Sequence, residues 1–197
     1  MKKRITAMLA ILILALQLLQ VSDVMAANGV AKVGNLKTGI TTTRSTNISW
    51  KQLKNVSGYE VCRSDSIDGN YALIKTVTAG NGAFFNVKLN SGTEYHYKVR
   101  AFTVVKGTKV YGKYSKALTV ATKQTAKQSA TTKCRANMRK QAGMKNAWLL
   151  TIPKGQNVSI LCATKDKTGA QWYKVSYKDN GKKVKGYVKE NLLSILK

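Results

Sequence analysis

The dipeptide Asn180-Gly181 constrains the fold of this chain most strongly, because it stands between two short runs of alternating apolar residues. Asn and Gly both tolerate positive φ, and this pair between alternating runs is the strongest short-range signal of a β-hairpin. The run before it reads WYKVSY, residues 172–177, and the run after it reads KGYVKENLL, residues 185–193. The sequence therefore predicts two paired strands near its end and a β fold around them.

Short β-like runs with turn residues between them also recur through the first half of the chain. The strand candidates there cover residues 47–50, 58–64, 71–77, 84–89, 93–105 and 117–121. Regular spacing of short strands with period-two alternation favours a β-sandwich. In the fifth candidate, alternation places Tyr95 and Tyr97 on one face and His96 on the other, so we expect His96 to be a surface side chain.

These runs resemble a fibronectin type III domain of the form common on exported bacterial proteins. Trp50 matches the core Trp of that family's second strand, and GYEVCRS, residues 58–64, resembles its third strand. LNSGTEYHYKVRAF, residues 89–102, resembles the family's L-x-x-G-T-x-Y-x-Y-x-V-R-A block. The resemblance implies an all-β, immunoglobulin-like β-sandwich over residues 29–123, with Tyr95 as its corner tyrosine. It also implies that this first domain is a spacer or a protein-interaction module.

Residues 134–197 resemble a bacterial Src-homology-3 (SH3-like) domain. Residues 136–139 are similar to the LNVR signature that opens such domains, and residues 147–155 are similar to the stretch before their second turn. Residues 156–163 fit the strand that follows, and the two runs of the hairpin complete the order. The resemblance implies a small SH3-like β-barrel that binds peptidoglycan, commonly its peptides or cross-bridges. By position in the motifs, the candidate ligand-binding residues are Asn137, Arg139, Trp172, Tyr173 and Tyr187.

A barrel of this size buries a limited core, so most of its aromatic side chains are expected to be structural. Trp148 and Tyr177, like the aromatic ligand-binding candidates, are therefore expected to be mainly structural. Strand alternation places Trp172 and Tyr173 on opposite faces, so one should lie in the core and the other in a groove. An aromatic groove rimmed by Lys and Arg suits a ligand with sugar or peptide faces and carboxylates.

Residues 124–133 are polar and contain no aromatic or large aliphatic side chain. They are predicted to form a flexible linker, so that the two domains move partly independently.

Residues 1–26 predict a secretory signal peptide. A basic start at residues 2–4 precedes an apolar run, and Val24 and Ala26 occupy the positions that a signal peptidase reads. Cleavage is expected after Ala26, which leaves no stable membrane span. An uncleaved membrane anchor is the alternative, although the apolar run is slightly short for one. The expected location is extracellular, in association with the cell wall.

The chain of 197 residues carries a formal net charge of +26, and both halves are basic. Such a charge attracts a protein to anionic surfaces, and wall peptides and teichoic polymers supply carboxylates and phosphates. Lysines spread over β surfaces can also serve solvation alone. Binding to nucleic acid would be non-specific and strongly salt-dependent, so no specific nucleic-acid partner is expected.

Catalytic signals are missing from the sequence. It has one His and contains no HExxH, CxxC or GxSxG motif, so we expect no catalytic residue, cofactor or metal. Its cysteines are Cys62, Cys134 and Cys162, and the last two either pair or stay free. The sequence thus predicts a non-catalytic wall protein that binds peptidoglycan and anionic wall polymers through its second domain. An adhesin or assembly factor that binds another surface protein through its first domain is the alternative.

Overall fold

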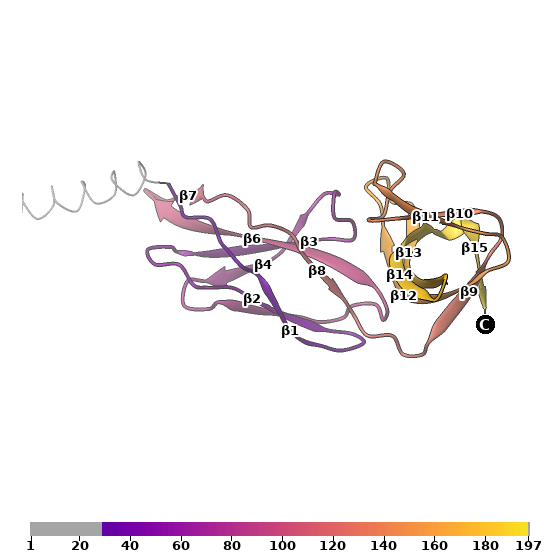
Figure 1. The fold of residues 1–197 in the computed structure, drawn as a ribbon. Helices are drawn as coiled ribbons and strands as arrows, with labels where there is room; N and C mark the ends of the chain where they lie inside the picture. The colour runs from indigo at the N-terminus through magenta and orange to yellow at the C-terminus, as the bar shows by residue number, and fades with distance from the viewer. Residues whose placement is uncertain (1–28, 197) are drawn as a thin grey trace, which may run out of the picture.

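The computed structural model describes residues 29–196, which form two lobes that lie end to end (Figure 1). The elements are β1 (Lys37–Thr41), β2 (Thr46–Ser49), β3 (Gly58–Ser64), β4 (Ala72–Thr78), β5 (Ala83–Asn86), β6 (Glu94–Val105), β7 (Thr108–Tyr111), β8 (Leu118–Ala121), β9 (Gln128–Thr132), β10 (Ala136–Arg139), β11 (Trp148–Ile152), β12 (Asn157–Lys165), β13 (Gln171–Asp179), β14 (Lys182–Lys189), the 3-10 turn η1 (Glu190–Leu192) and β15 (Leu193–Leu196). The all-β prediction is confirmed. The predicted signal peptide, residues 1–26, lies outside the described residues, within which no helix is long and apolar enough to cross a membrane.

The first lobe consists of two antiparallel sheets packed face to face. One sheet has the order β1-β2-β5, and the other has the order β4-β3-β6-β7, with β8 also paired to β6. The core between them contains Trp50 and Tyr59, whose rings meet edge to face with centroids 5.3 Å apart. This arrangement confirms the predicted immunoglobulin-like β-sandwich.

Strand β6 has the alternation that the sequence predicts. Tyr95, Tyr97, Val99 and Ala101 all face the core and are buried there. The hydroxyl of Tyr95 accepts a hydrogen bond from the backbone N–H of Asn90 at 2.9 Å, which is the bond expected of a corner tyrosine. This bond ties the start of β6 to the loop that leads into it.

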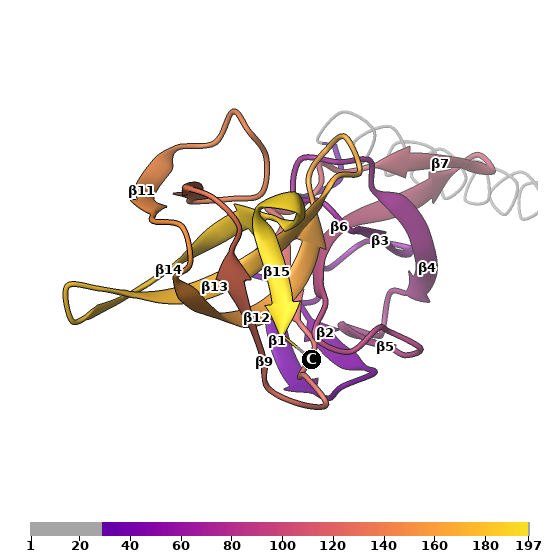
Figure 2. The same ribbon diagram turned by 90° about the vertical axis from the view of Figure 1, so that its right-hand side faces the viewer.

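The predicted hairpin is formed by β13 and β14. Their pairing runs from Trp172 opposite Lys189 to Asp179 opposite Lys182. Asn180 and Gly181 lie at the turn with φ values of 46° and 83°. Positive φ at both central residues is the conformation of the two-residue turns that match strand twist, and Asn-Gly adopts it at little cost. The turn projects away from the rest of its sheet (Figure 2).

The second lobe is one antiparallel sheet of seven strands that curls around a single core (Figure 1). Its strand order is β11-β10-β14-β13-β12-β9-β15. Met138, Ile152, Val175 and Val188 come from four of these strands and are all fully buried in the same cluster. A Cβ atom at Gly186 would collide with Met138, so glycine lets β14 and β10 approach closely.

The prediction of a flexible linker at residues 124–133 is wrong for half of its length. Gln128–Thr132 forms β9, which pairs with β12 on one side and β15 on the other. Ala130 and Thr132 alternate into the interior and are almost fully buried. Small and β-branched side chains can fill a strand position of a narrow core, so a stretch without large apolar residues still forms a central strand.

The two lobes also contact each other directly, contrary to the expectation of independent movement. Thr93 and Ala163 form an isolated parallel bridge, in which the N–H of Ala163 donates to the carbonyl of Gly92 at 2.7 Å. The N–H of Lys165 donates to the carbonyl of Asp65 at 3.1 Å. These bonds attach the end of β12 to two loops of the sandwich and set the orientation of the lobes.

Candidate functional site

Two of the five predicted ligand-binding residues, Trp172 and Tyr187, are buried. Trp172 is 1% exposed and packs in a small cluster with Ala142 and Tyr187. The Nε1–H of Trp172 donates to a carboxylate oxygen of Asp166 at 2.9 Å. Tyr187 is almost fully buried between the lobes. The hypothesis that Trp172 lines a groove is therefore wrong, whereas Tyr187 reaches only the wall of a cavity between the lobes.

Alternation correctly predicts that Trp172 and Tyr173 lie on opposite faces of β13. It does not predict what covers each face. Tyr173 and Val175 lie on the side that faces the core of the curled sheet. Trp172 lies on the outer side, where the loop between β10 and β11 covers it through Ala142. Tyr173 is half-buried at the edge of the core, and its hydroxyl donates to Glu190 at 3.3 Å. Burial, together with Glu190, raises the pKa of Tyr173.

The other two candidates, Asn137 and Arg139, lie on the outer face of β10. Asn137 pairs with Thr151 across the β10–β11 ladder, and Arg139 pairs with Trp148. Trp148 is 59% exposed, and its Nε1–H donates to the hydroxyl of Thr151 at 3.3 Å. That hydroxyl in turn donates to Oδ1 of Asn137 at 2.7 Å. We call these four residues, Asn137, Arg139, Trp148 and Thr151, the Trp148 surface.

Trp148 is the residue that sequence reasoning missed. Strict alternation along β11 places it on the same side as Leu150 and Ile152, which face the core. A β-bulge shifts the register between the Met138–Leu150 pair and the Arg139–Trp148 pair. The extra residue turns the indole to the outer face, and no turn signal in the sequence marks such a bulge.

Arg139 holds the loop that borders this surface. Its Nη1–H donates to the carbonyl of Asn146 at 2.7 Å. The side-chain amide of Asn146 donates to the carbonyl of Ala142 at 2.7 Å. The loop over Trp172 is thereby fixed from both sides, and the remaining N–H groups of the guanidinium can donate to a ligand.

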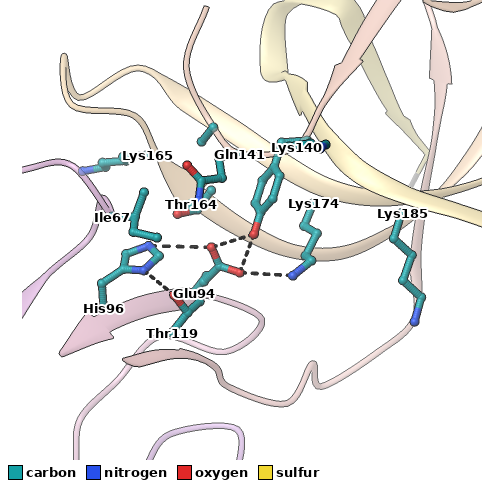
Figure 3. Close-up of a pocket in the computed structure, with 12 residues that line it drawn as sticks. Ile67, Glu94, His96, Thr119, Lys140, Gln141, Thr164, Lys165, Lys174 and Lys185 are labelled. Atoms are coloured by element: carbon teal, nitrogen blue, oxygen red, sulfur yellow. Dashed lines mark hydrogen bonds and ion pairs between the residues drawn. The ribbon is translucent and has the colours of Figure 1, made fainter. Parts of the chain in front are cut away.

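The second group of polar residues is the junction between the lobes, centred on Glu94 (Figure 3). Glu94 belongs to the sandwich and is 2% exposed. The hydroxyl of Tyr187 lies 3.0 Å from both of its carboxylate oxygens, and Nζ of Lys174 lies 3.6 Å from Oε2. The thiol of Cys162 lies 3.8 Å from the same oxygen. With His96, these residues form what we call the Glu94 junction.

Burial dominates the electrostatics of this junction. It raises the pKa of the Cys162 thiol to about 12, and the carboxylate of Glu94 adds to that effect. The same two causes raise the pKa of Tyr187, so its hydroxyl keeps its proton and acts as a donor to Glu94. The carboxylate of Glu94 thus receives a hydrogen bond and a nearby ammonium group from the other lobe, as a buried charge requires.

The expectation that His96 is a surface side chain is wrong. It lies on the outer face of the sandwich as predicted, but the second lobe covers that face and leaves His96 2% exposed. Its Nδ1 lies 2.9 Å from the hydroxyl of Thr119. Burial lowers the pKa of His96 to about 4, helped by Lys174, although Asp65 and Asp68 oppose the shift. His96 is therefore neutral at pH 7.

We expect acid to weaken the fold through His96. Its pKa falls from an ordinary value of 6.5 to about 4 on folding, so between these values the unfolded chain binds a proton that the folded chain does not. The stability that this contributes is complete above pH 6.5 and is lost as the pH falls to about 4. At about 1.4 kcal/mol per pKa unit, the total loss is about 3 kcal/mol.

Urea unfolding of the wild type and of His96→Gln, measured from about pH 8 to about pH 4, checks this prediction. Carboxylates titrate in the same range in both proteins, so the difference between the two curves isolates the imidazole. The curves of unfolding free energy against pH for the two proteins should converge as the pH falls. Curves that stay parallel over the whole range would show that His96 titrates alike in both states.

Metal and disulfide chemistry find no support in residues 29–196. No group of three or more His, Cys, Asp or Glu side chains in that range is placed to hold a metal ion. Cys134 is exposed and Cys162 is buried, and both are free. Cys134 and Cys162 therefore stay free in the folded chain and do not pair with each other.

Comparison with known proteins leaves the family of the chain open. No family model matches it, and no curated protein matches it. Similar solved structures include a fibronectin type III domain of the human KIAA0970 protein, at 18% identity and a TM-score of 0.40, covering 48% of this chain and 74% of that one. The sixth fibronectin type III domain of human fibronectin type III domain containing protein 3 has 15% identity and a TM-score of 0.42. That match covers 50% of this chain and 90% of the other. A fibronectin type III domain of human contactin 1 has 14% sequence identity and a TM-score of 0.39, and the match covers 50% of this chain and 86% of that one.

The arrangement of its sheets defines the class of this protein. It is an all-β protein whose first lobe is an immunoglobulin-like sandwich, and the structures similar to it are fibronectin type III domains that match about half of its length.

Proposed function

We propose that this chain is an exported, non-catalytic cell-envelope protein whose second lobe, an SH3-like domain, binds peptidoglycan or the anionic polymers associated with it. In this proposal the first lobe, a fibronectin type III domain, is a spacer or a protein-interaction module. The observation that carries the proposal is the Trp148 surface. There an exposed indole stands beside an amide and a guanidinium on the outer face of the second lobe.

The chemistry of the Trp148 surface suits a polymer with sugar and peptide parts. The face of the indole can cover the apolar side of a sugar ring or a peptide, while Arg139 can donate to a carboxylate. The bond from Trp148 to Thr151 holds the ring in place before a ligand arrives. A side chain that is already ordered loses little entropy on binding, which favours affinity.

The titratable groups of the chain support a non-catalytic role. Its one His is buried, neutral at pH 7 and hydrogen-bonded to Thr119. The thiol of Cys162 is buried, and its pKa of about 12 keeps it protonated, so it is a poor nucleophile. The net charge of +26 supports retention on an anionic wall rather than any one reaction.

Replacing Trp148 with alanine should lower binding of the protein to purified cell walls by about tenfold, because an exposed anchor ring carries much of the energy of such a contact. Folding should be unchanged, since the side chain is outside both cores. The measurement is a pulldown on walls with and without teichoic polymers across a salt series. At high salt the attraction of exposed charges is screened, so the binding that remains reports the contact with the ring.

Phe85→Ala is the matched control, because Phe85 is an aromatic residue that is 55% exposed on the first lobe. It should bind walls as the wild type does at every salt concentration. Equal binding by Trp148→Ala and Phe85→Ala at high salt would overturn the Trp148 surface as the binding site. Loss of all binding at high salt by the wild type would leave charge as the only cause of retention.

A further inference from the structure

A cavity of about 410 Å³ opens over the Glu94 junction and is lined by residues of both lobes (Figure 3). The second lobe contributes four lysines to its wall: Lys140, Lys165, Lys174 and Lys185. They come from four places on the outer face of the curled sheet, namely the residue after β10, the end of β12, the middle of β13 and β14. The first lobe contributes the neutral His96 and the buried Glu94. Ligand sites form preferentially at such boundaries between domains.

The charges of this cavity are not balanced. Glu94 is the only carboxylate in its lining, and its partners are Lys174 and the hydroxyl of Tyr187. Among residues 29–196, Lys140, Lys165 and Lys185 have no carboxylate within ion-pair distance, so three lysines of the cavity wall have no counter-charge. A ligand with two or more negative charges would complete the arrangement.

The positions of the lysines indicate the length of such a ligand. Lys165 and Lys185 lie at opposite sides of the cavity, with Lys174 and Glu94 between them (Figure 3). Their ammonium groups therefore do not converge on one point. The arrangement fits two or more charged groups in succession along a ligand better than one charged group.

From this geometry we infer that the junction cavity binds a ligand with consecutive phosphate groups, which lies across the boundary between the two lobes. Lysine is a common phosphate-binding residue that acts as a point charge, and the charged groups of the second lobe that line the cavity are all lysines. The amide of Gln141, which also lines it, can donate to phosphate oxygens. This site is separate from the Trp148 surface, so either site can fail while the other stands.

Calorimetric titration of the folded protein with inorganic pyrophosphate tests the inference, and tricarballylate serves as a carboxylate ligand of comparable charge. Pyrophosphate should bind more tightly than tricarballylate. The double variant Lys165→Gln/Lys185→Gln should weaken pyrophosphate binding by about tenfold, since two ionic contacts are lost. Amide NMR signals of His96 and Thr119 should move on titration, because both residues line the cavity from the other lobe.

The matched control is Lys75→Gln/Lys154→Gln, which removes the same charge from exposed positions outside the cavity, one in each lobe. It should bind pyrophosphate as the wild type does. Equal losses in the two double variants, or equal affinity for pyrophosphate and tricarballylate, would overturn the site. A parallel titration with short poly(glycerol phosphate) identifies the source of the phosphate. Tighter binding of this polymer indicates a phosphodiester chain, and tighter binding of pyrophosphate indicates a small ligand.

Discussion

Replacing Trp172 with alanine is expected to destabilise the second lobe by about 3–5 kcal/mol, the usual cost of removing a large buried aromatic side chain. Trp172 is 1% exposed and fills the space between β13, Ala142 and Tyr187. Alanine would leave a cavity there, because the loop over it is held by Arg139 and Asn146 and cannot easily collapse. Most of this lobe's stability is at risk, since small domains have only a few kcal/mol in reserve.

Part of the expected loss comes from the carboxylate of Asp166. Burial works to raise its pKa, but hydrogen bonds from Thr168, Trp172 and Ala170 outweigh burial and hold the pKa below its usual value. Without the indole N–H, one oxygen of this buried carboxylate would lose its partner. An unsatisfied buried group of this kind costs about 1–3 kcal/mol or more.

Chemical denaturation, followed by far-ultraviolet circular dichroism, measures this effect. Trp172→Phe keeps a buried ring but loses the bond to Asp166 and part of the ring volume, so it should fall between the alanine variant and the wild type. Trp148→Ala removes the same side chain from an exposed place and should change stability by less than about 0.5 kcal/mol. If both alanine variants lost equal stability, the assignment of one indole to the interior and the other to the surface would fail.

Glu94→Ala is expected to separate the two lobes and to lower the stability of the folded chain by about 3 kcal/mol, because it removes one partner of a buried charged cluster. The hydroxyl of Tyr187 would lose both carboxylate oxygens that it contacts at 3.0 Å. Lys174 is partly exposed and can turn to water, so most of the cost falls on Tyr187 and the thiol of Cys162.

Limited trypsin digestion reports the separation directly. Lys127 is exposed between β8 and β9, and cutting there requires the neighbouring chain to open. Glu94→Ala should be cut much faster than the wild type and should yield two resistant fragments. The two lobes should also unfold in separate transitions in urea.

Glu60→Ala is the matched control. Glu60 is a buried carboxylate in the same sheet of the sandwich, but its partners are Arg100, Lys109 and Tyr111, all in the first lobe. This variant should destabilise the sandwich and leave the rate of cutting at Lys127 close to that of the wild type under native conditions. Similar digestion of both variants would mean that Glu94 stabilises only its own lobe.

The sequence by itself determined the elements that depend on local chemistry. Asn180-Gly181 specifies its own turn, because both residues accept positive φ, and the paired strands follow from it. The alternation of Tyr95 and Tyr97 along β6 determines which side of that strand faces the sandwich core. These features need no information from distant residues. The immunoglobulin-like fold of the first lobe was predicted from the resemblance of its strands to fibronectin type III domains.

The candidate site could be predicted only in part. Asn137 and Arg139 do lie on an outer face, but the indole that joins them is Trp148 and not Trp172. A bulge in β11 turns Trp148 outward, and its position depends on how β11 pairs with β10. The strand at Gln128–Thr132 was missed for a related reason, because Ala and Thr form a core strand only when β12 and β15 enclose them.

Only the tertiary structure decided which outward-facing side chains are covered. His96 and Tyr187 both point away from the cores of their own lobes, as alternation requires, and each is buried because the other lobe lies against it. Burial of this kind depends on where a second surface docks, and the period of a strand carries no information about that. The buried carboxylate of Glu94 lies between the two lobes, and its partners Lys174 and Tyr187 come from the second lobe, so its burial is satisfied only when the faces meet.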